Sequence, residues 1–350
     1  MPGSMDEVAR HAGVSKSTVS LVLNNRPGTS AEMRRRVLDA VAAVGYTLPE
    51  QRAQRESTSL THAPVIALVH CVDEEPDVDA GLTHLYLSYR NGIQRFTQGR
   101  DISVMLVTSY RDGNEDSLSY QLLAQEERAL DGLILMGPGL HRNTTLIQRV
   151  LDRQIPAVIL GRSWPELPIS SVSQDHTEQA HLILDHLLAL GHQHIGFVAR
   201  EIDRQYDWFQ WRLKAYRTAM QSKFEQADDR YVAIGRDVTD SVVGLLSAHP
   251  QVTALFALND HIAYQAMAAA VQAGRTVPDT LSVVGIDGAI KPQAGLPELT
   301  TVSFPHEEVG YLAAELLVKQ LENNHLRTAR LTVNSHFVAG ASCTAPGIVA

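Results

Sequence analysis

The first 46 residues place apolar side chains at the spacing of three short helices. Residues 5–12, 16–25 and 31–46 each repeat apolar positions at i, i+3 and i+4, with charged or hydroxyl-bearing residues between them. The repeats are interrupted twice by short polar segments that contain glycine. This pattern predicts a small all-α domain over residues 1–46.

Capping residues mark where these helices begin and end. Ser4, Ser15 and Ser30 each precede a predicted helix, where a serine hydroxyl accepts a hydrogen bond from a first-turn N–H. Gly13 follows the first helix and can adopt the left-handed conformation that ends one. Two short helices joined by a tight turn, with a third beside them, form a helix-turn-helix. Such a domain inserts its second helix into the major groove of DNA, N-terminus first.

Polar groups suited to DNA gather around this second helix. Val19, Val22 and Leu23 recur at core spacing, which leaves the other side chains of the helix facing outward. The predicted DNA-binding residues are Ser15, Lys16, Ser17, Thr18, Ser20, Leu21, Asn24, Asn25 and Ser30. The last three suit phosphate contacts, which position the protein without reading sequence. On pattern alone, a three-helix bundle with an ordinary polar face remains an alternative.

From residue 64 onward, short apolar runs alternate with amphipathic helices. The first series has runs at 65–70, 102–109, 131–138 and 156–161, with helices at 85–100, 117–129 and 143–154. The second series has helices at 176–192, 208–222, 240–250 and 260–275, with runs at 194–200, 231–235, 254–259 and 281–287. Continuous apolar strands that are each followed by a helix predict parallel sheets covered on both faces. Two series predict two lobes, with a ligand site between them at the carboxyl ends of the strands.

Residues 47–63 separate these two patterns. They lack apolar periodicity and are rich in polar residues, so we predict a linker or hinge between a head (1–46) and a body (64–350). A chain of 350 residues is long enough for two or three domains.

Charge divides at the same place. The net charge is −9, yet residues 1–62 carry eight Lys and Arg against six Asp and Glu. A mildly basic head on an acidic body is consistent with a head that contacts phosphate.

Several classes of protein are disfavoured by the sequence. The apolar runs are too short to span a bilayer, the N-terminus does not resemble a secretory signal, and two cysteines are too few for a disulfide framework. We find no phosphate-binding Gly-x4-Gly-Lys-Ser/Thr loop, no His-Glu-x-x-His and no Gly-x-Ser-x-Gly. The histidines of 181–194 lack metal-ligand spacing. We therefore expect no enzyme activity, no cofactor, no metal and no membrane partner, and a cytoplasmic, nucleoid-associated location.

The head "DEVARHAGVSKSTVSLVLNNRPGTSAEMRRRVLDAVAAVGY" resembles that of the LacI/GalR transcription regulators. The body resembles the periplasmic-binding-protein-like core of the same family at "HLLALGHQHIGFV", "ALFALNDHIAYQAM", "VPDTLSVVGID" and "LTTVSFPHEEVGYLAAELL". The resemblance implies a helix-turn-helix head plus a core of two doubly wound parallel-sheet lobes. It also implies a homodimeric, DNA-binding repressor that recognises a near-palindromic operator and responds to a small-molecule effector, most often a sugar. Inducer and corepressor responses both occur in the family and both stay open.

The resemblance also suggests which residues meet the effector. Positions that match the family's cleft residues are Arg212, Asp287, Asn259, Asp260 and Asp175, and Trp164 is a further candidate because its ring could stack on a sugar face. A guanidinium, carboxylates and an amide are the groups that bind hydroxyls. Alternatives remain for all of them: Asp287, Asn259, Asp260 and Asp175 can cap helices, Arg212 can lie on an exposed helix face, and Trp164 can pack within its own lobe.

Three positions depart from the family pattern. Leu21 stands where many members have an arginine that reads guanine. Glu56 stands where the family's hinge helix inserts a leucine into the minor groove. Asp237 stands where an aromatic residue often stacks on the effector.

An exported solute-binding protein is the rival interpretation, and such a protein would have no use for a helix-turn-helix. A sugar-handling enzyme of similar layout is a second rival, which the missing catalytic motifs disfavour.

Overall fold

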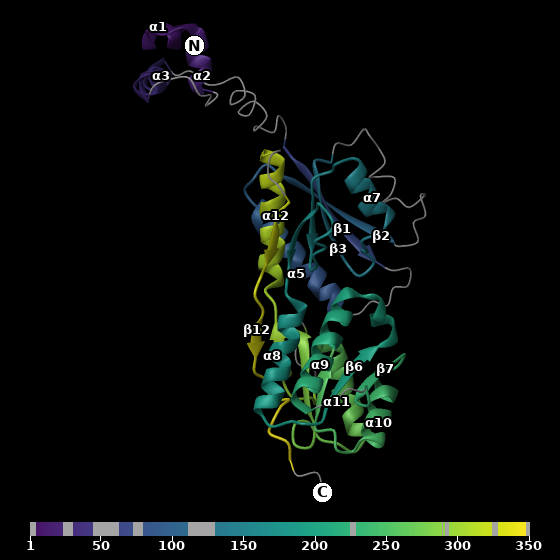
Figure 1. Ribbon diagram of the computed structural model, residues 1–350. Helices are drawn as coiled ribbons and strands as arrows, with labels where there is room; N and C mark the ends of the chain where they lie inside the picture. Colours follow the sequence, from purple (N-terminus) through teal and green to yellow (C-terminus); the bar gives the residue numbers. More distant parts are fainter. Residues whose placement is uncertain are drawn as a thin grey trace. The chain divides into compact units, whose positions relative to one another are not determined.

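The computed structural model describes residues 5–23, 31–44, 63–72, 80–110, 130–224, 229–288, 290, 294–323 and 328–347 (Figure 1). They fall into two compact units, one over residues 1–62 and 322–325 and the other over 63–321 and 326–350. The predicted helix 117–129, the linker 47–62 and Glu56 lie outside the described residues.

The first unit contains the three predicted helices. They are α1 (Met5–Ala12), α2 (Lys16–Leu23) and α3 (Ala31–Val44). Their buried apolar residues form one core: Val8, Ala9, Ala12, Val19, Val22, Val37 and Ala40. Gly13 has a φ of +63°, as its predicted helix-ending role requires. The helix-turn-helix pattern is therefore confirmed over the described part of the head.

The second unit contains two lobes, each built on a six-stranded sheet. The sheet of the first lobe has the order β2-β1-β3-β4-β5-β11, all parallel. Its strands are β1 (Val65–Val72), β2 (Ser103–Tyr110), β3 (Gly132–Met136), β4 (Ala157–Leu160), β5 (Ser170–Ser173) and β11 (Arg330–Thr332). Helices α5 (Ala80–Thr97) and α12 (His306–Glu322) cover one face, and α7 (Thr145–Asp152) covers the other.

The sheet of the second lobe has the order β7-β6-β8-β9-β10-β12, in which β12 alone is antiparallel. Its strands are β6 (Ile195–Arg200), β7 (Val232–Gly235), β8 (Ala254–Ala257), β9 (Ser282–Asp287), β10 (Thr300–Ser303) and β12 (His336–Val338). Its helices are α8 (His176–Ala189), α9 (Asp207–Phe224), α10 (Val238–Ala248) and α11 (Asp260–Gln272), with the short 3-10 helix η1 (Glu201–Gln205). One continuous core fills this lobe.

The chain crosses between the lobes three times. The connections run from β5 into α8, from β10 into α12 and from β11 into β12. Our expectation of two consecutive series was therefore incomplete, because α12 and β11 return to the first lobe after the second lobe has formed. The signal was missed because β5 reads Ser-Ser-Val-Ser and β10 reads Thr-Thr-Val-Ser, which are buried strands without an apolar run.

Helices α5 and α12 approach closely enough to require glycine. A Cβ on Gly92 would lie 1.8 Å from the Glu307 carbonyl oxygen, and one on Gly310 would lie 2.1 Å from the Tyr89 carbonyl oxygen. Two reciprocal glycines thus let the backbones of the two helices touch. Within the described residues, no helix combines the length and the apolarity that crossing a membrane would need.

Candidate DNA-reading helix and effector site

The predicted DNA-reading residues lie at the N-terminal end of α2. Lys16 and Ser17 are exposed, and Thr18 is half-buried. The Ser15 hydroxyl accepts from the Thr18 N–H at 3.2 Å, so Ser15 caps the helix as predicted. It also shares short hydrogen bonds with the Ser17 and Thr18 hydroxyls, at 2.7 and 2.8 Å.

Other predicted DNA-binding residues are described in less detail or not at all. Ser20 and Leu21 belong to α2, but only their backbone is described. Asn24, Asn25 and Ser30 lie outside the described residues. A positively charged side chain and hydroxyls at the end of a recognition helix can donate to base edges and to phosphates.

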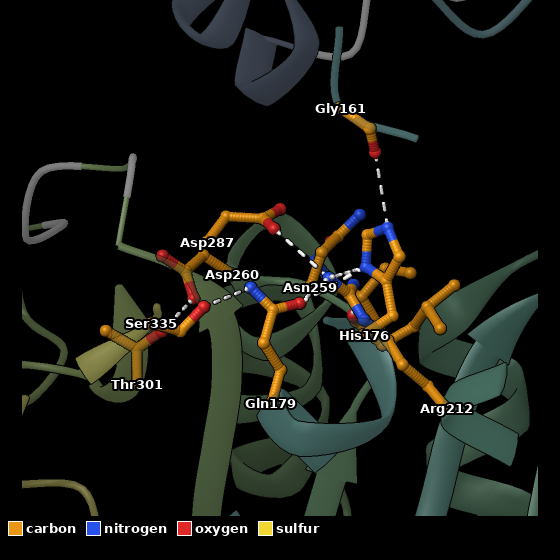
Figure 2. A network of polar contacts seen from close by, with 11 residues as sticks. Gly161, His176, Gln179, Arg212, Asn259, Asp260, Asp287, Thr301 and Ser335 are labelled. Carbon is orange, nitrogen blue, oxygen red and sulfur yellow. Dashed lines mark hydrogen bonds and ion pairs between the residues drawn. The ribbon is translucent and has the colours of Figure 1, made fainter. Parts of the chain in front are cut away.

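The candidate effector residues of the second lobe gather at the carboxyl ends of its strands. Asp287 ends β9, Asn259 follows β8, and Arg212 reaches them from α9 (Figure 2). In doubly wound sheets, ligands bind at this edge. Arg212, Asp287 and Asn259 therefore share one site, although they are up to 75 positions apart in the chain.

Arg212 is buried, with 3% of its side chain exposed. Its Nη1 donates to the Leu258 carbonyl oxygen at 2.6 Å, and its Nη2 donates to Gln179 Oε1 at 2.9 Å. Nη2 also lies 3.5 Å from Asp287 Oδ1. Burial lowers the pKa of the guanidinium, and the charge of Asp287 opposes that shift. Because arginine stays protonated, the site holds a fixed cation beside the Asp287 carboxyl group.

Asp287 has an unusual backbone. Its φ is +124°, a region that L-residues other than glycine rarely adopt, and its side chain is 20% exposed. Such conformations persist where the surrounding structure enforces them, and they cluster at ligand-binding sites. The conformation directs the carboxylate of the last residue of β9 toward Arg212 (Figure 2).

His176 adds a link between the lobes. Its Nε2 lies 3.3 Å from the carbonyl oxygen of Gly161, at the end of β4 in the first lobe. A carbonyl only accepts, so Nε2 carries the proton and Nδ1 is left as the acceptor for Arg212 Nη2 at 3.4 Å. Burial and the neighbouring Arg212 lower the pKa of His176 to about 3. His176 is therefore neutral at physiological pH.

Asn259 and Asp260 differ in what they offer a ligand. Asn259 caps α11, where its Oδ1 accepts from the Ile262 N–H at 2.9 Å, and its side chain is half-buried. Asp260, which we expected as the cap, is only 2% exposed and accepts from the Thr301 hydroxyl at 2.6 Å. The proposal below uses Asn259 and does not rest on Asp260, whose carboxylate is engaged by Thr301.

Asp175 and Trp164 are also engaged within the protein. Asp175 caps α8 by accepting from the N–H groups of Thr177 and Glu178 at 2.8 and 3.0 Å. Trp164 is 3% exposed, and its ring packs in the core of the first lobe while its indole N–H donates to Asp207 of the second lobe. Both side chains are thus engaged within the protein, and the proposal below does not rest on them. Asp237, at the departure from the family pattern, caps α10.

A second set of contacts joins the lobes, which we call the interlobe clasp: Arg142, Arg162 and Trp164 of the first lobe with Tyr206, Asp207 and Trp208 of the second. The Trp164 indole N–H donates to Asp207 Oδ2 at 2.9 Å, and Arg142 Nη2 donates to Asp207 Oδ1 at 3.3 Å. The Arg162 guanidinium lies 5.0 Å from the Trp208 ring centre, and Trp208 stacks on Tyr206 at 4.3 Å. Burial lowers the pKa of Arg162, and Asp207 is the main opposing charge.

Sequence reasoning missed His176 and Gln179 and, apart from Trp164, the residues of the clasp. A signal for Gln179 does exist, because it falls in phase with Ile183 and Leu187 on the buried stripe of α8. A glutamine in that stripe must find hydrogen-bond partners inside the protein. Nothing local in the sequence identifies those partners.

A helix-turn-helix unit together with a two-lobed α/β body defines the class of ligand-responsive DNA-binding regulators. Residues 4–48 match the family described as bacterial regulatory proteins, lacI family, and residues 184–343 match a periplasmic binding protein-like domain. The HTH-type transcriptional regulator DegA of Bacillus subtilis (strain 168) is 29% identical over 314 residues, which cover 89% of this chain and 89% of DegA.

Two solved structures extend the comparison. A complex of the transcriptional regulator CelR with cellobiose is 27% identical, covers 97% of this chain and 99% of CelR, and has a TM-score of 0.68. A lac repressor dimer bound to operator and the anti-inducer ONPF is 24% identical, covers 98% of this chain and 99% of that one, and has a TM-score of 0.64. This chain belongs to the lacI family of transcriptional regulators and carries a periplasmic-binding-protein-like effector domain. Its membership confirms the predicted fold class and the prediction of a regulator that is not an enzyme.

Proposed function

We propose that this chain is a repressor that binds operator DNA through its head and an uncharged sugar between its lobes. The observation that carries the sugar site is the Arg212–Asp287 pair, with Asn259 beside it, at the carboxyl ends of β8 and β9. A guanidinium and a carboxylate side by side can donate to and accept from neighbouring hydroxyls at once. CelR, whose solved complex holds cellobiose, supports this ligand class.

The charge balance of the site favours a neutral ligand. Asp287 lies 3.5 Å from Arg212, so the positive charge is already countered within the protein. A phosphorylated or carboxylated ligand that reaches Arg212 would bring its negative charge close to the Asp287 carboxylate, and two like charges in contact repel. A polyhydroxyl ligand has no such cost. We therefore expect an uncharged sugar to bind more tightly than its phosphate.

For the assembly we propose a homodimer on a near-palindromic operator, and the lac repressor structure, which holds a dimer bound to operator, supports the dimer. Each head would read one half-site, and a two-fold dimer matches a two-fold operator. An effector that prefers one arrangement of the lobes would shift the population toward it and so change operator affinity.

We retain residues 1–46 as the head, 47–63 as the hinge and 64–350 as the core. A regulator of this kind acts on the chromosome, so we infer a cytoplasmic, nucleoid-associated location.

The test is a thermal-stability panel on the full chain with cellobiose, sucrose, ribose, their phosphates and purines. A ligand at 100 times its dissociation constant adds about 2.7 kcal/mol of stability, which shows as a raised melting temperature. The ligand that stabilises the chain is then added to complexes with an operator selected from a randomised library. Release identifies an inducer and tighter binding identifies a corepressor, while a panel in which only phosphates or purines act would refute the uncharged-sugar proposal.

Arg212→Ala tests the assignment of the site. We expect this variant to bind the selected operator as the wild type does and to lose the sugar response, because the donor fork is gone. Lys214→Ala, on an exposed position of the same helix, is the matched control. A normal calorimetric titration of Arg212→Ala with the active sugar would remove Arg212 from the site.

A further inference from the structure

We propose that Gln179 is a positioning residue that holds Arg212 for the effector and transmits its position to the third connection between the lobes, at Ser335. This inference rests on the proposed role of Arg212 in effector binding. Figure 2 shows the Gln179 side chain between the two residues. In this arrangement the side-chain amide of Gln179 links the bound effector to the relative position of the lobes.

The two ends of the Gln179 amide are used for different partners. Its Oε1 accepts from Arg212 Nη2 at 2.9 Å, and its Nε2 donates to the Ser335 hydroxyl oxygen at 2.9 Å. A guanidinium only donates, so the amide cannot be turned around without setting two donors against each other. The orientation of Gln179 is therefore determined by Arg212.

Burial makes these contacts hard to exchange for water. Gln179 is 0% exposed and Arg212 is 3% exposed. A buried acceptor that loses its donor has no substitute, and this is costly. When an effector draws the guanidinium toward itself, the amide must move with it, and its Nε2 must pull on Ser335.

His176 does not offer Gln179 another donor. Its Nδ1 lies 3.2 Å from Gln179 Oε1, but its proton is on Nε2, which faces the Gly161 carbonyl. Arg212 is consequently the donor that orients the amide. The same histidine ties the start of α8 to the end of β4, so the helix that carries Gln179 is anchored to the first lobe.

Ser335 lies where a displacement matters for the lobes. It sits between β11, which belongs to the first sheet, and β12, which belongs to the second. A connection that spans both lobes must change its geometry when they rotate. A hydrogen bond from the effector site to this connection gives the site a physical route to the lobe arrangement.

The experiment is a double-mutant cycle between Arg212→Met and Ser335→Ala, made in the wild-type chain and again with Gln179→Met. Methionine matches the length of glutamine and removes both hydrogen bonds without adding a charge. All three tryptophans, Trp164, Trp208 and Trp211, lie in the second unit, so their fluorescence reports its unfolding in the full chain. Arg212 and Ser335 would be independent without Gln179, because no direct contact between them is found among the described residues.

We expect the two substitutions to be coupled by at least fivefold in the unfolding equilibrium constant when Gln179 is present. The coupling should fall below twofold with Gln179→Met, and it should return with Gln179→Glu, whose carboxylate can accept from both Arg212 and the Ser335 hydroxyl. Gln320→Met, which removes a 2.6 Å bond to the Ser170 hydroxyl elsewhere, should leave the cycle unchanged. Equal coupling with and without Gln179, or none in the wild type, would overturn the proposal. If Arg212→Met does not fold, Arg212→Ala, which also has no side-chain donor, replaces it.

A second readout separates this inference from the proposed function. With cellobiose as the probe, Ser335→Ala should bind it within threefold of the wild type, yet the effect of cellobiose on operator affinity should shrink at least fivefold. An unchanged effect in Ser335→Ala contradicts the link. If neither cellobiose, sucrose nor ribose acts on the wild type, the sugar proposal fails, while the mutant cycle still decides the role of Gln179.

Discussion

At the scale of single residues, burial decides what the polar groups around Arg212 can do. His176 sits beside a permanent cation and is fully enclosed, so adding a proton to it would place two positive charges in contact. Its neutral form has one donor and one acceptor, and both are used. The same enclosure keeps Gln179 and Arg212 in a single arrangement.

The histidine makes stability depend on pH. The pKa of His176 is about 3 in the folded chain and about 6.5 when unfolded, so below pH 6.5 the unfolded state binds a proton that the folded state does not. Its contribution is complete above pH 6.5 and is lost as the pH falls. At pH 5 the loss should be about 2 kcal/mol.

Urea unfolding of wild type and His176→Asn at pH 7.5 and pH 5 measures this effect. Between pH 7.5 and pH 5, the unfolding free energy of the wild type should fall by about 2 kcal/mol more than that of the variant. His181→Asn, on an exposed position of the same helix, should behave like the wild type. An equal pH dependence in wild type and His176→Asn would show that His176 protonates in the folded state.

At the scale of elements, the contact between α5 and α12 depends on glycine. Gly92→Ala would place a Cβ 1.8 Å from the Glu307 carbonyl oxygen, so the helices must separate. We expect a destabilisation of about 1–3 kcal/mol, typical of overpacking. Gly244→Ala in α10 is the matched control, because no atom lies within 4 Å of its Cβ position. That control should stabilise the chain by up to about 1 kcal/mol, since alanine is the better helix former. Chemical denaturation measures both, and a neutral Gly92→Ala would contradict this packing.

The exposed end of α2 is the element that should read the operator. Lys16→Ala and Ser17→Ala should change base preference at one or two positions of each half-site, because a good bidentate contact contributes about 1–3 kcal/mol of discrimination. Selection from a randomised DNA library measures the preference. Lys319→Ala, exposed in α12, serves as the control. An unchanged preference in both variants would leave these side chains with phosphate contacts at most.

At the scale of the whole effector-binding unit, two kinds of contact hold the lobes together. Three chain crossings join them covalently, and the interlobe clasp joins them through Asp207. The Arg142–Asp207 ion pair is largely exposed on the arginine side and contributes little. Arg162 is buried, and the opposite charge nearest in effect is that of Asp207 on the other lobe. Separating the lobes would therefore leave the Arg162 guanidinium without this counter-charge.

Asp207→Asn should therefore favour separated lobes. The amide oxygen can still accept from Trp164, but the negative charge near Arg162 is lost. We expect a loss of about 1–3 kcal/mol in unfolding free energy and a larger radius of gyration by X-ray scattering in the absence of ligand. Glu166→Gln removes only the exposed Arg142–Glu166 pair and should change neither quantity. A scattering profile of Asp207→Asn that matches the wild type would show that the crossings alone set the lobe arrangement.

The sequence by itself determined the features that depend on neighbouring residues. The i, i+3, i+4 repeats and the Gly13 stop were sufficient for the three helices of the head. Apolar runs followed by amphipathic helices were sufficient for the parallel strands β1 to β4 and β6 to β9. Resemblance added Arg212 and Asp287 as site candidates. These inferences succeed because helix period, strand period and caps are local properties of the chain.

Tertiary structure alone decided which distant polar groups meet. Gln179 and Ser335 are 156 positions apart, and Arg212 and Gln179 are 33 apart. Burial of Asp260 and Trp164 likewise follows from how the lobes fold, since both residue types are also common in binding sites. The return of α12 and β11 to the first lobe follows from the order in which the strands pair, which no local pattern records. Side chains that are far apart in the sequence and follow no helix or strand period become neighbours only after the strands of both sheets have paired.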